Sequence, residues 1–334
     1  MLEQWSTICI RHFRGRPVGE ASADYVDFLT LQAQIELGDG LFGELHERAR
    51  WVATLDEFVG RDQIEALNRR PDVITVRTGI GSGDAYTLVV SSKDGKDFVI
   101  DRLARRLREY VPQMSSDWPT VANELYERAR VLSPGLLLRA AGLGRSSQEL
   151  VGLVSARWLA GRVAPVDRTG SGFEAWIPLD EHVDWFRSDG GLRADLLRIS
   201  GREENGRLVI EALVVEAKLR SSWTTTHADR QVDNTVKLFA HALASEPDAP
   251  DDGSFWRRVV LDAMEQASKQ YRTSKGDLRA ELAAFSAWSN GAPSRAIPPI
   301  LRGAWLDGAY VLRDVRGLVC TIWPDDVEVS VSAA

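Results

Sequence analysis

The second half of the chain alternates between hydrophobic patterns with the period of a strand and patterns with the period of a helix. Residues 173–179 alternate as a strand, and apolar runs at 192–199 and 208–219 predict two more strands. A capping box at residues 146–149 predicts a helix that reaches about residue 160. Apolar residues at helical spacing predict another helix over residues 227–245. The predicted order is therefore a helix, three strands and a helix.

The rest of the chain predicts further helices and strands, so the expected fold class is α/β, more narrowly α+β. The first part predicts helices near 22–36, 42–52, 56–69, 97–111 and 118–132, with strands at 73–77 and 86–90. The last part predicts helices near 254–272 and 275–288, with strands near 309–313 and 317–323. A breaker cluster at residues 133–135 indicates a domain boundary. We expect a mixed α/β accessory or partner-docking domain at residues 1–140 and a second domain at residues 141–334.

The two apolar runs at 192–199 and 208–219 are joined by a hairpin signal. Asn205 and Gly206 are typical of a two-residue type I′ turn, because both turn positions need a positive φ. With that turn, Asp195 faces Glu216 on the neighbouring strand, with Cβ atoms roughly 5 Å apart. Lys218 lies two residues beyond Glu216 and so points to the same face.

The facing acids predict a cation between them. Two carboxylates directly opposite each other repel and destabilise a sheet unless something positive lies between them. A hard divalent cation suits that place, and the backbone carbonyl of Ala217 is a further candidate ligand. Ile210 and Val214 share the face of Glu216, so we expect that face to be partly buried, where unpaired carboxylates are costly. The alternative is an exposed acid pair that Lys218 and nearby arginines neutralise.

An acid on one strand followed by Glu216-Ala217-Lys218 at the end of the next resembles the PD-(D/E)XK nuclease superfamily. The resemblance covers roughly residues 145–245 and implies an α-β-β-β-α-β core, restriction-endonuclease-like, with a central mixed sheet flanked by helices. Ala194 stands where the motif's name has proline. The implied activity is hydrolysis of phosphodiester bonds by a water that Mg²⁺ or Mn²⁺ activates, with DNA favoured over RNA as substrate.

The resemblance also implies roles for individual residues. Asp195 and Glu216 would hold the metal, and Lys218 would orient the attacking water and stabilise the transition state. Glu149 matches a helical glutamate that some members use as a further ligand, although the capping box explains it without a metal. Gln231 resembles a glutamine that RecB-like members place near the active site, and an exposed polar position on a helix is the alternative.

The formal net charge of −7 bears on how the chain would meet nucleic acid. Basic side chains supply most of the affinity for nucleic acid, so we expect either clustered basic residues or a protein partner that delivers the substrate. The resemblance implies a subunit of a prokaryotic defence or restriction complex with an ATPase or helicase partner. A homo-oligomer is left open.

The sequence also indicates where the protein works. No apolar run approaches the ~18 residues of a membrane span, and the first residues do not form a signal peptide. Cys9 and Cys320 lie far apart and give neither a metal-ligand spacing nor a disulfide framework. We therefore expect a cytoplasmic protein without membrane association.

Two other functions stay open. The first is a non-catalytic module, either a scaffold or a nucleic-acid-binding domain, that keeps the nuclease fold. The second is a hydrolase that uses the polar cluster after residue 179, which comprises Asp180, Glu181, His182 and Asp184. A loop at the exit of the preceding strand explains that cluster more simply.

Overall fold

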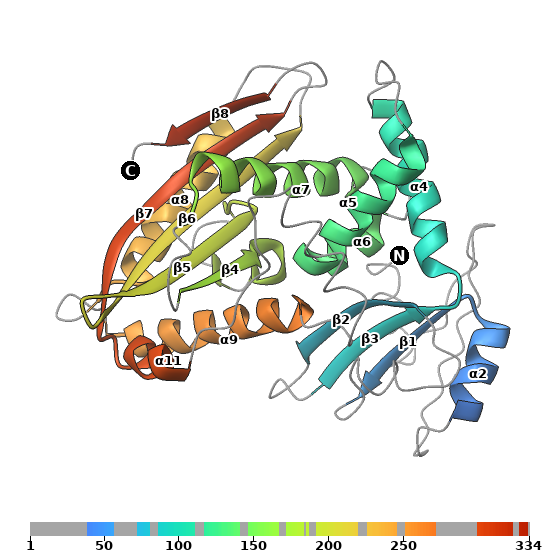
Figure 1. Ribbon diagram of the computed structural model, residues 1–334, viewed down its shortest axis with the longest axis horizontal. Coiled ribbons are helices and arrows are strands. Elements are labelled where there is room, and N and C mark those ends of the chain that lie inside the picture. The colour runs from blue at the N-terminus through green and yellow to red at the C-terminus, as the bar shows by residue number, and fades with distance from the viewer. Residues whose placement is uncertain are drawn as a thin grey trace, which may run out of the picture.

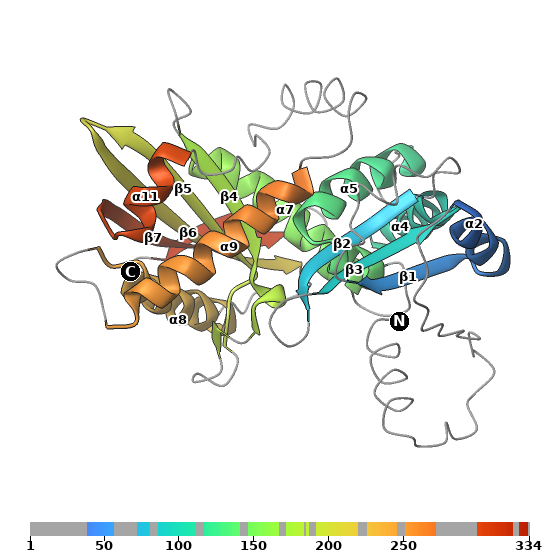
Figure 2. The ribbon, with the colours of Figure 1, turned by 90° about the horizontal axis from the view of Figure 1, so that it is seen from below.

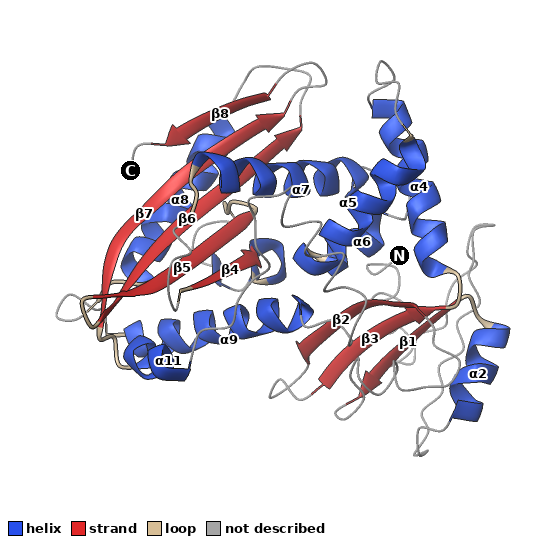
Figure 3. Cartoon of the chain, viewed as in Figure 1, coloured by secondary structure: helices blue, strands red, loops and turns tan. Residues whose placement is uncertain are grey.

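The computed structural model describes twelve segments of the chain: residues 39–56, 72–80, 86–110, 117–140, 146–166, 172–183, 185–186, 192–219, 226–245, 251–271, 299–322 and 327–332. They form a mixed α/β structure with one small and one large sheet (Figure 1). Figure 3 shows helices beside both sheets, so the predicted class, α+β, is confirmed.

The large sheet contains five strands in the order β4-β5-β6-β7-β8. Their bounds are Phe173–Pro178, Leu196–Glu204, Arg207–Leu219, Tyr310–Ile322 and Val327–Ser332. Neighbouring strands run antiparallel except for β6 and β7, which are parallel. The sheet is therefore mixed, and the parallel pair joins parts of the sequence that lie far apart.

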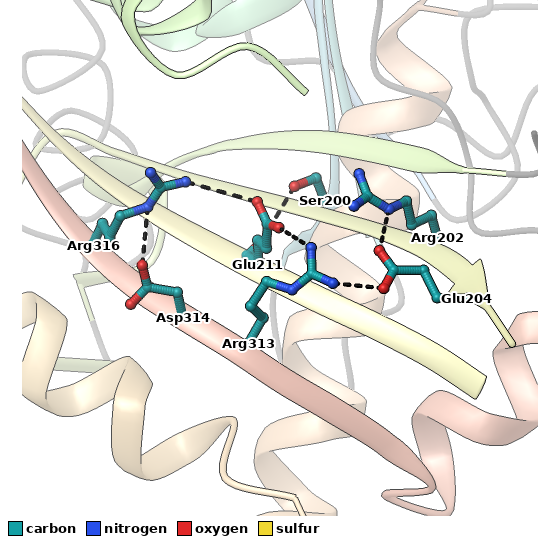
Figure 4. Close-up of polar contacts among 7 residues, drawn as sticks. All are labelled: Ser200, Arg202, Glu204, Glu211, Arg313, Asp314 and Arg316. Atoms are coloured by element: carbon teal, nitrogen blue, oxygen red, sulfur yellow. Dashed lines mark hydrogen bonds and ion pairs between the residues drawn. The ribbon is translucent and has the colours of Figure 1, made fainter. Parts of the chain in front are cut away.

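Strand β7 corrects one prediction, because the two short strands expected near 309–313 and 317–323 are a single strand. Residues 314–316, between the two predicted strands, belong to it as well. In the structure the register of β6 and β7 shifts between Ile210 and Glu211, so that Arg313 becomes the extra residue of a β-bulge. Figure 4 shows the charged side chains of this stretch paired with those of β5 and β6 on the surface of the sheet.

Helices cover both faces of the large sheet. Helix α7 (Ser146–Val163) crosses one face, and α8 (Thr226–Ala242) lies behind the sheet on the other (Figure 1). Helix α9 (Gly253–Tyr271) lies against β4 and, with α11 (Pro299–Leu306), belongs to the same hydrophobic cluster as α8 (Figure 2). The predicted helices at 146–160, 227–245 and 254–272 are therefore confirmed.

Alternation along β6 decides which residues meet which helices. Ile210, Ala212 and Val214 point into the cluster that contains α8, whereas Leu213 and Val215 point into the cluster that contains α7. Glu216 and Lys218 continue the first series, so they face the α8 side. The core on that side therefore surrounds the acid that the sequence places near the end of β6.

The first part of the chain forms a small antiparallel sheet in the order β1-β3-β2. The strands are β1 (Trp51–Asp56), β2 (Asp72–Ile80) and β3 (Tyr86–Ser92). Helix α2 (Asp39–Arg48) precedes them and α4 (Gly95–Tyr110) follows. The helix predicted at 42–52 is corrected: it ends at Arg48, and β1 begins at Trp51 because its backbone pairs with the distant strand β3.

Helices α5 (Trp118–Leu132) and α6 (Pro134–Ala140) connect this region to the large sheet. One hydrophobic cluster joins Leu103, Tyr126 and Leu137 with Leu196 and Val215 of the large sheet. A core thus extends across residue 140, and the division into two domains there stays a prediction. Apart from Asp56, the helices predicted near 22–36, 56–69 and 275–288 lie outside the described residues. Within the described residues no helix has the length and apolarity needed to cross a membrane.

Candidate functional site

The predicted hairpin sets the geometry of the site. Asn205 and Gly206 have φ angles of 52° and 77°, so both turn residues adopt the positive φ that a type I′ turn needs. From the turn, β5 and β6 pair without a register shift up to Leu196 and Val215. One residue further, the Asp195 N–H donates to the carbonyl of Val215 at 3.1 Å. The predicted register is therefore confirmed from the turn to Leu196 and Val215. Asp195 lies just beyond this pairing, close enough to Glu216 for its charge to shift the pKa of that acid.

The two acids sit in different surroundings. Glu216 is fully buried, whereas Asp195 is partly exposed. Oδ2 of Asp195 accepts a hydrogen bond of 2.8 Å from the backbone N–H of Ala217. Neither carboxyl oxygen of Glu216 meets a donor with full hydrogen-bond geometry among the described residues. Its partner is the Lys218 ammonium group, which forms an ion pair with Oε1.

Burial and mutual repulsion change how the acids hold protons. Burial is the main cause that raises the pKa of Glu216 to about 8, and the nearby charge of Asp195 adds to the shift against the attraction of Lys218. Burial also raises the pKa of Asp195, although the Ala217 N–H and Lys218 oppose it. Two adjacent acids whose pKa values are raised, mainly by burial, mark a candidate functional site.

Gln231 of helix α8 lies at the site, as predicted. Its Oε1 accepts a hydrogen bond of 3.2 Å from Nζ of Lys218, and its Nε2 donates one of 2.7 Å to the carbonyl of Arg193. The amide therefore connects the lysine on β6 to the segment that leads into Asp195. Both contacts assign a definite orientation to the side chain, which the alternative of an exposed helical position would not.

Ala217 presents its backbone to the acids. Alternate residues of a strand direct their N–H and carbonyl groups to the same neighbour. The carbonyl of Val215 and the N–H of Ala217 both point toward β5. The carbonyl of Ala217 therefore points to the side on which Asp195 lies, as its predicted role requires.

Glu149 is exposed in the first turn of α7. Gly152, one turn later in this helix, lies against Ala217 and Leu219 at the end of β6. No group of three or more metal-binding side chains forms among the described residues. The role of Glu149 as a ligand stays a prediction.

Asp180, which the sequence places in the polar cluster of the alternative hydrolase, is a neighbour of the acid pair. It belongs to the short helix η2 (Leu179–Glu181), and the Leu179 N–H donates to the carbonyl of Asp195 at 2.9 Å. The charge of Asp180 contributes to the raised pKa of Asp195. The rest of the polar cluster follows the exit of β4, with His182 stacked on Trp185, and Asp184 lies outside the described residues.

Asn234 and Thr235, also missed, contact the backbone beside Asp195 from helix α8. Their spacing from Gln231, three and four residues, places all three side chains on one helix face, and that was the available signal. The spacing did not indicate which part of the chain this helix face contacts.

The donor set fits a hard divalent cation. Glu216 offers buried carboxyl oxygens, one of them ion-paired with Lys218. Asp195 offers a second carboxyl group, and Ala217 offers a carbonyl directed to the same side. Mg²⁺ takes oxygen ligands and completes its coordination with waters, so two carboxyl groups are enough protein ligands. Comparison of the chain with known protein families, with curated proteins and with solved structures found no match.

Proposed function

We propose that this protein is a metal-dependent nuclease whose active site is formed by Asp195, Glu216 and Lys218, with Gln231 beside them. The observation that carries the proposal is a fully buried Glu216 beside a second acid, Asp195, with the single lysine Lys218 as its ion-pair partner. A buried carboxyl group without adequate partners costs stability. A cation-binding role accounts for an arrangement that packing alone would not favour.

The order and pairing of the elements support the same proposal. Helix α7, strands β4, β5 and β6, helix α8 and strand β7 follow the α-β-β-β-α-β order that resemblance to the PD-(D/E)XK superfamily implies. Asp195 directly precedes the second strand of this series, β5. Glu216 and Lys218 lie near the end of the third strand, β6. A fold hosts many activities, so the side chains carry more weight than this order.

Each residue then has a task in the reaction. Asp195, Glu216 and the carbonyl of Ala217 would hold Mg²⁺ or Mn²⁺, which when bound supplies Lewis-acid activation of a water and of the phosphate. Lys218 keeps a positive charge beside the acids and stabilises negative charge that develops on the phosphate oxygens. Gln231 holds the lysine ammonium group on the α8 side of the site. Burial around Glu216 limits the access of bulk water to the ligand oxygens.

DNA is the substrate we propose, and a protein partner is the means of delivery. DNA follows from the resemblance to the PD-(D/E)XK superfamily. The formal net charge of −7 supports the partner, since nucleic-acid affinity depends on basic side chains. In a prokaryotic defence or restriction complex, an ATPase or helicase partner would bring the DNA to this chain.

Plasmid DNA tests the proposal directly. The full chain is incubated with plasmid in Mg²⁺, in Mn²⁺ and in EDTA, beside Asp195→Asn and Glu216→Gln. Glu211→Gln is the matched control, because Glu211 lies on the same strand but in a surface ion-pair cluster. We expect metal-dependent cleavage by the wild type and by Glu211→Gln, and none by the other two.

A second readout separates the proposal from its alternative. Calorimetric titration with Mn²⁺ reports whether the acids bind a cation at all. Mn²⁺ binding without cleavage of plasmid or of single-stranded DNA and RNA would replace the nuclease by a non-catalytic metal-binding module. Absence of Mn²⁺ binding would overturn the metal site itself.

A further inference from the structure

Three side chains of α8 hold three consecutive residues of the chain just before Asp195. Nε2 of Gln231 donates to the carbonyl of Arg193 at 2.7 Å, and Nδ2 of Asn234 donates to the carbonyl of Leu192 at 2.8 Å. Oγ1 of Thr235 accepts from the N–H of Ala194 at 2.9 Å. The helix therefore bonds to the backbone of residues 192–194, one residue after another.

These bonds take the place of strand pairing, which residues 192–194 do not have. The pairing of β5 with β4 and with β6 starts at Leu196. Residues 192–194 precede it, and Ala194 is nearly fully buried, so its N–H would be costly without a partner. The three side chains satisfy this backbone and at the same time fix its position relative to α8.

Thr235 is the most constrained of the three. It is fully buried, and its hydroxyl donates to the carbonyl of Gln231 at 2.7 Å while it accepts from Ala194. With its proton used on the helix, the hydroxyl oxygen is left to accept the Ala194 N–H. A side chain of the same shape without the hydroxyl would leave that buried N–H unsatisfied.

We propose that Asn234 and Thr235, together with Gln231, form a positioning clamp that sets where the Asp195 carboxyl group stands relative to Glu216. Asn234 and Thr235 touch neither acid and act through the backbone of residues 192–194. Gln231 also holds Lys218, so α8 positions both sides of the site. The inference rests on the proposed function for its consequence, a loss of metal affinity when the clamp is broken.

Substitutions at Thr235 test the clamp. Thr235→Val keeps the shape and removes the hydroxyl, whereas Thr235→Ser keeps the hydroxyl. Val236→Ala is the matched control, because Val236 is a buried neighbour on the same helix and its truncation destabilises without touching residues 192–194. Removing groups that orient metal ligands typically weakens metal binding about 10- to 100-fold. We expect that loss of Mn²⁺ affinity in Thr235→Val and little change in Thr235→Ser or Val236→Ala.

Asn234→Leu provides a second variant should Thr235→Val fold poorly, and we expect it to weaken Mn²⁺ binding as well.

Hydrogen exchange of the amides at 193–196, measured without metal, gives a readout that does not depend on the nuclease proposal. Faster exchange there in Thr235→Val than in Val236→Ala supports the clamp, and equal exchange overturns it. Equal Mn²⁺ affinities in Thr235→Val and Val236→Ala would also overturn it. Absence of Mn²⁺ binding by the wild type would overturn the proposed function instead, and exchange would then decide on the clamp.

Discussion

The β5–β6 hairpin carries charged side chains at both of its ends. At the turn end the charges are partly exposed and balanced, whereas at the far end one acid is buried and the acids outnumber the lysine. Near the turn, Arg313 pairs with Glu204 at 2.5 Å and with Glu211 at 3.1 Å, and Arg316 pairs with Asp314 at 3.2 Å (Figure 4). Arg202 adds a further bond to Glu204. These groups are partly exposed, and three arginines balance three acids.

The far end of the hairpin has two acids and one lysine, with one acid fully buried. Exposed ion pairs contribute little to stability because water already solvates both charges. Buried charges are costly unless they are paired. The turn end therefore places its charges at little cost, whereas the far end carries a cost that protonation of Glu216 reduces and that the proposed cation would offset. A cluster of charged side chains does not by itself indicate a functional site. Buried acids that outnumber their basic partners are the better indication.

The largest expected difference between the two ends is in catalysis. Lys218→Met removes the positive charge that opposes charge on the phosphate, and loss of one such group costs about 10²- to 10³-fold in rate. Its Mn²⁺ affinity should be largely retained, because a protonated lysine offers no lone pair to a metal. Single-turnover cleavage and calorimetric titration measure the two effects. Full activity in Lys218→Met would make the lysine an ion-pair partner only.

The pH dependence of stability should also distinguish the ends. Since Glu216 has a pKa of about 8 in the folded protein, above its ordinary value of 4.5, the folded state binds more protons than the unfolded state between these pH values. The free energy of unfolding of the metal-free protein should therefore fall as pH rises from about 4.5 to 8, by a few kcal/mol at most.

Urea denaturation at several pH values measures this slope. Glu216→Gln should reduce it, and Glu211→Gln, at the turn end, should leave it unchanged. A wild-type stability that rises with pH across this window would contradict the raised pKa of Glu216.

Metal should stabilise the far end alone. A ligand at a concentration a hundred times its dissociation constant stabilises the folded state by about 2.7 kcal/mol. We expect Mn²⁺ to raise the melting temperature of the wild type and of Glu211→Gln, and EDTA to reverse the change. The same shift in Asp195→Asn would locate the cation elsewhere.

The smallest effect is expected at the turn end. Arg313→Ala removes two ion pairs between an exposed arginine and partly exposed acids, so the free energy of unfolding should change by less than about 1 kcal/mol. Metal affinity and cleavage should stay at the wild-type level. A large loss of stability would show that the surface cluster holds the β6–β7 register.

The sequence predicted the part of the site that depends on local chemistry. Asn205 and Gly206 define the turn, the turn defines the register, and the register brings Asp195 to the end of the paired strands, near Glu216. The contacts from α8 could not be predicted this way, since Thr235 and Ala194 are 41 residues apart and no local pattern relates them. Asp180 reaches the vicinity of Asp195 through the similarly non-local pairing of β4 with β5.

The same distinction explains the errors in the fold. The sequence predicts separate strands on either side of residues 314–316, yet β7 continues through them with a bulge and surface ion pairs to β5 and β6. The start of β1 at Trp51 depends on pairing with β3, which the helical pattern before it does not reveal.

The parallel pairing of β6 with β7 also has a consequence for how the chain folds. Arg313 and Glu211, which meet across this pair, are 102 residues apart. The hairpin and α8 precede β7 in the chain, so the acids and their supports can assemble during synthesis while one edge of β6 is still open. Loop-closure entropy makes such distant pairing slow, and an open, apolar strand edge is prone to aggregate. Pairing with β7 would then cover the open edge of β6 and remove this risk of aggregation, well after the residues of the site have come together.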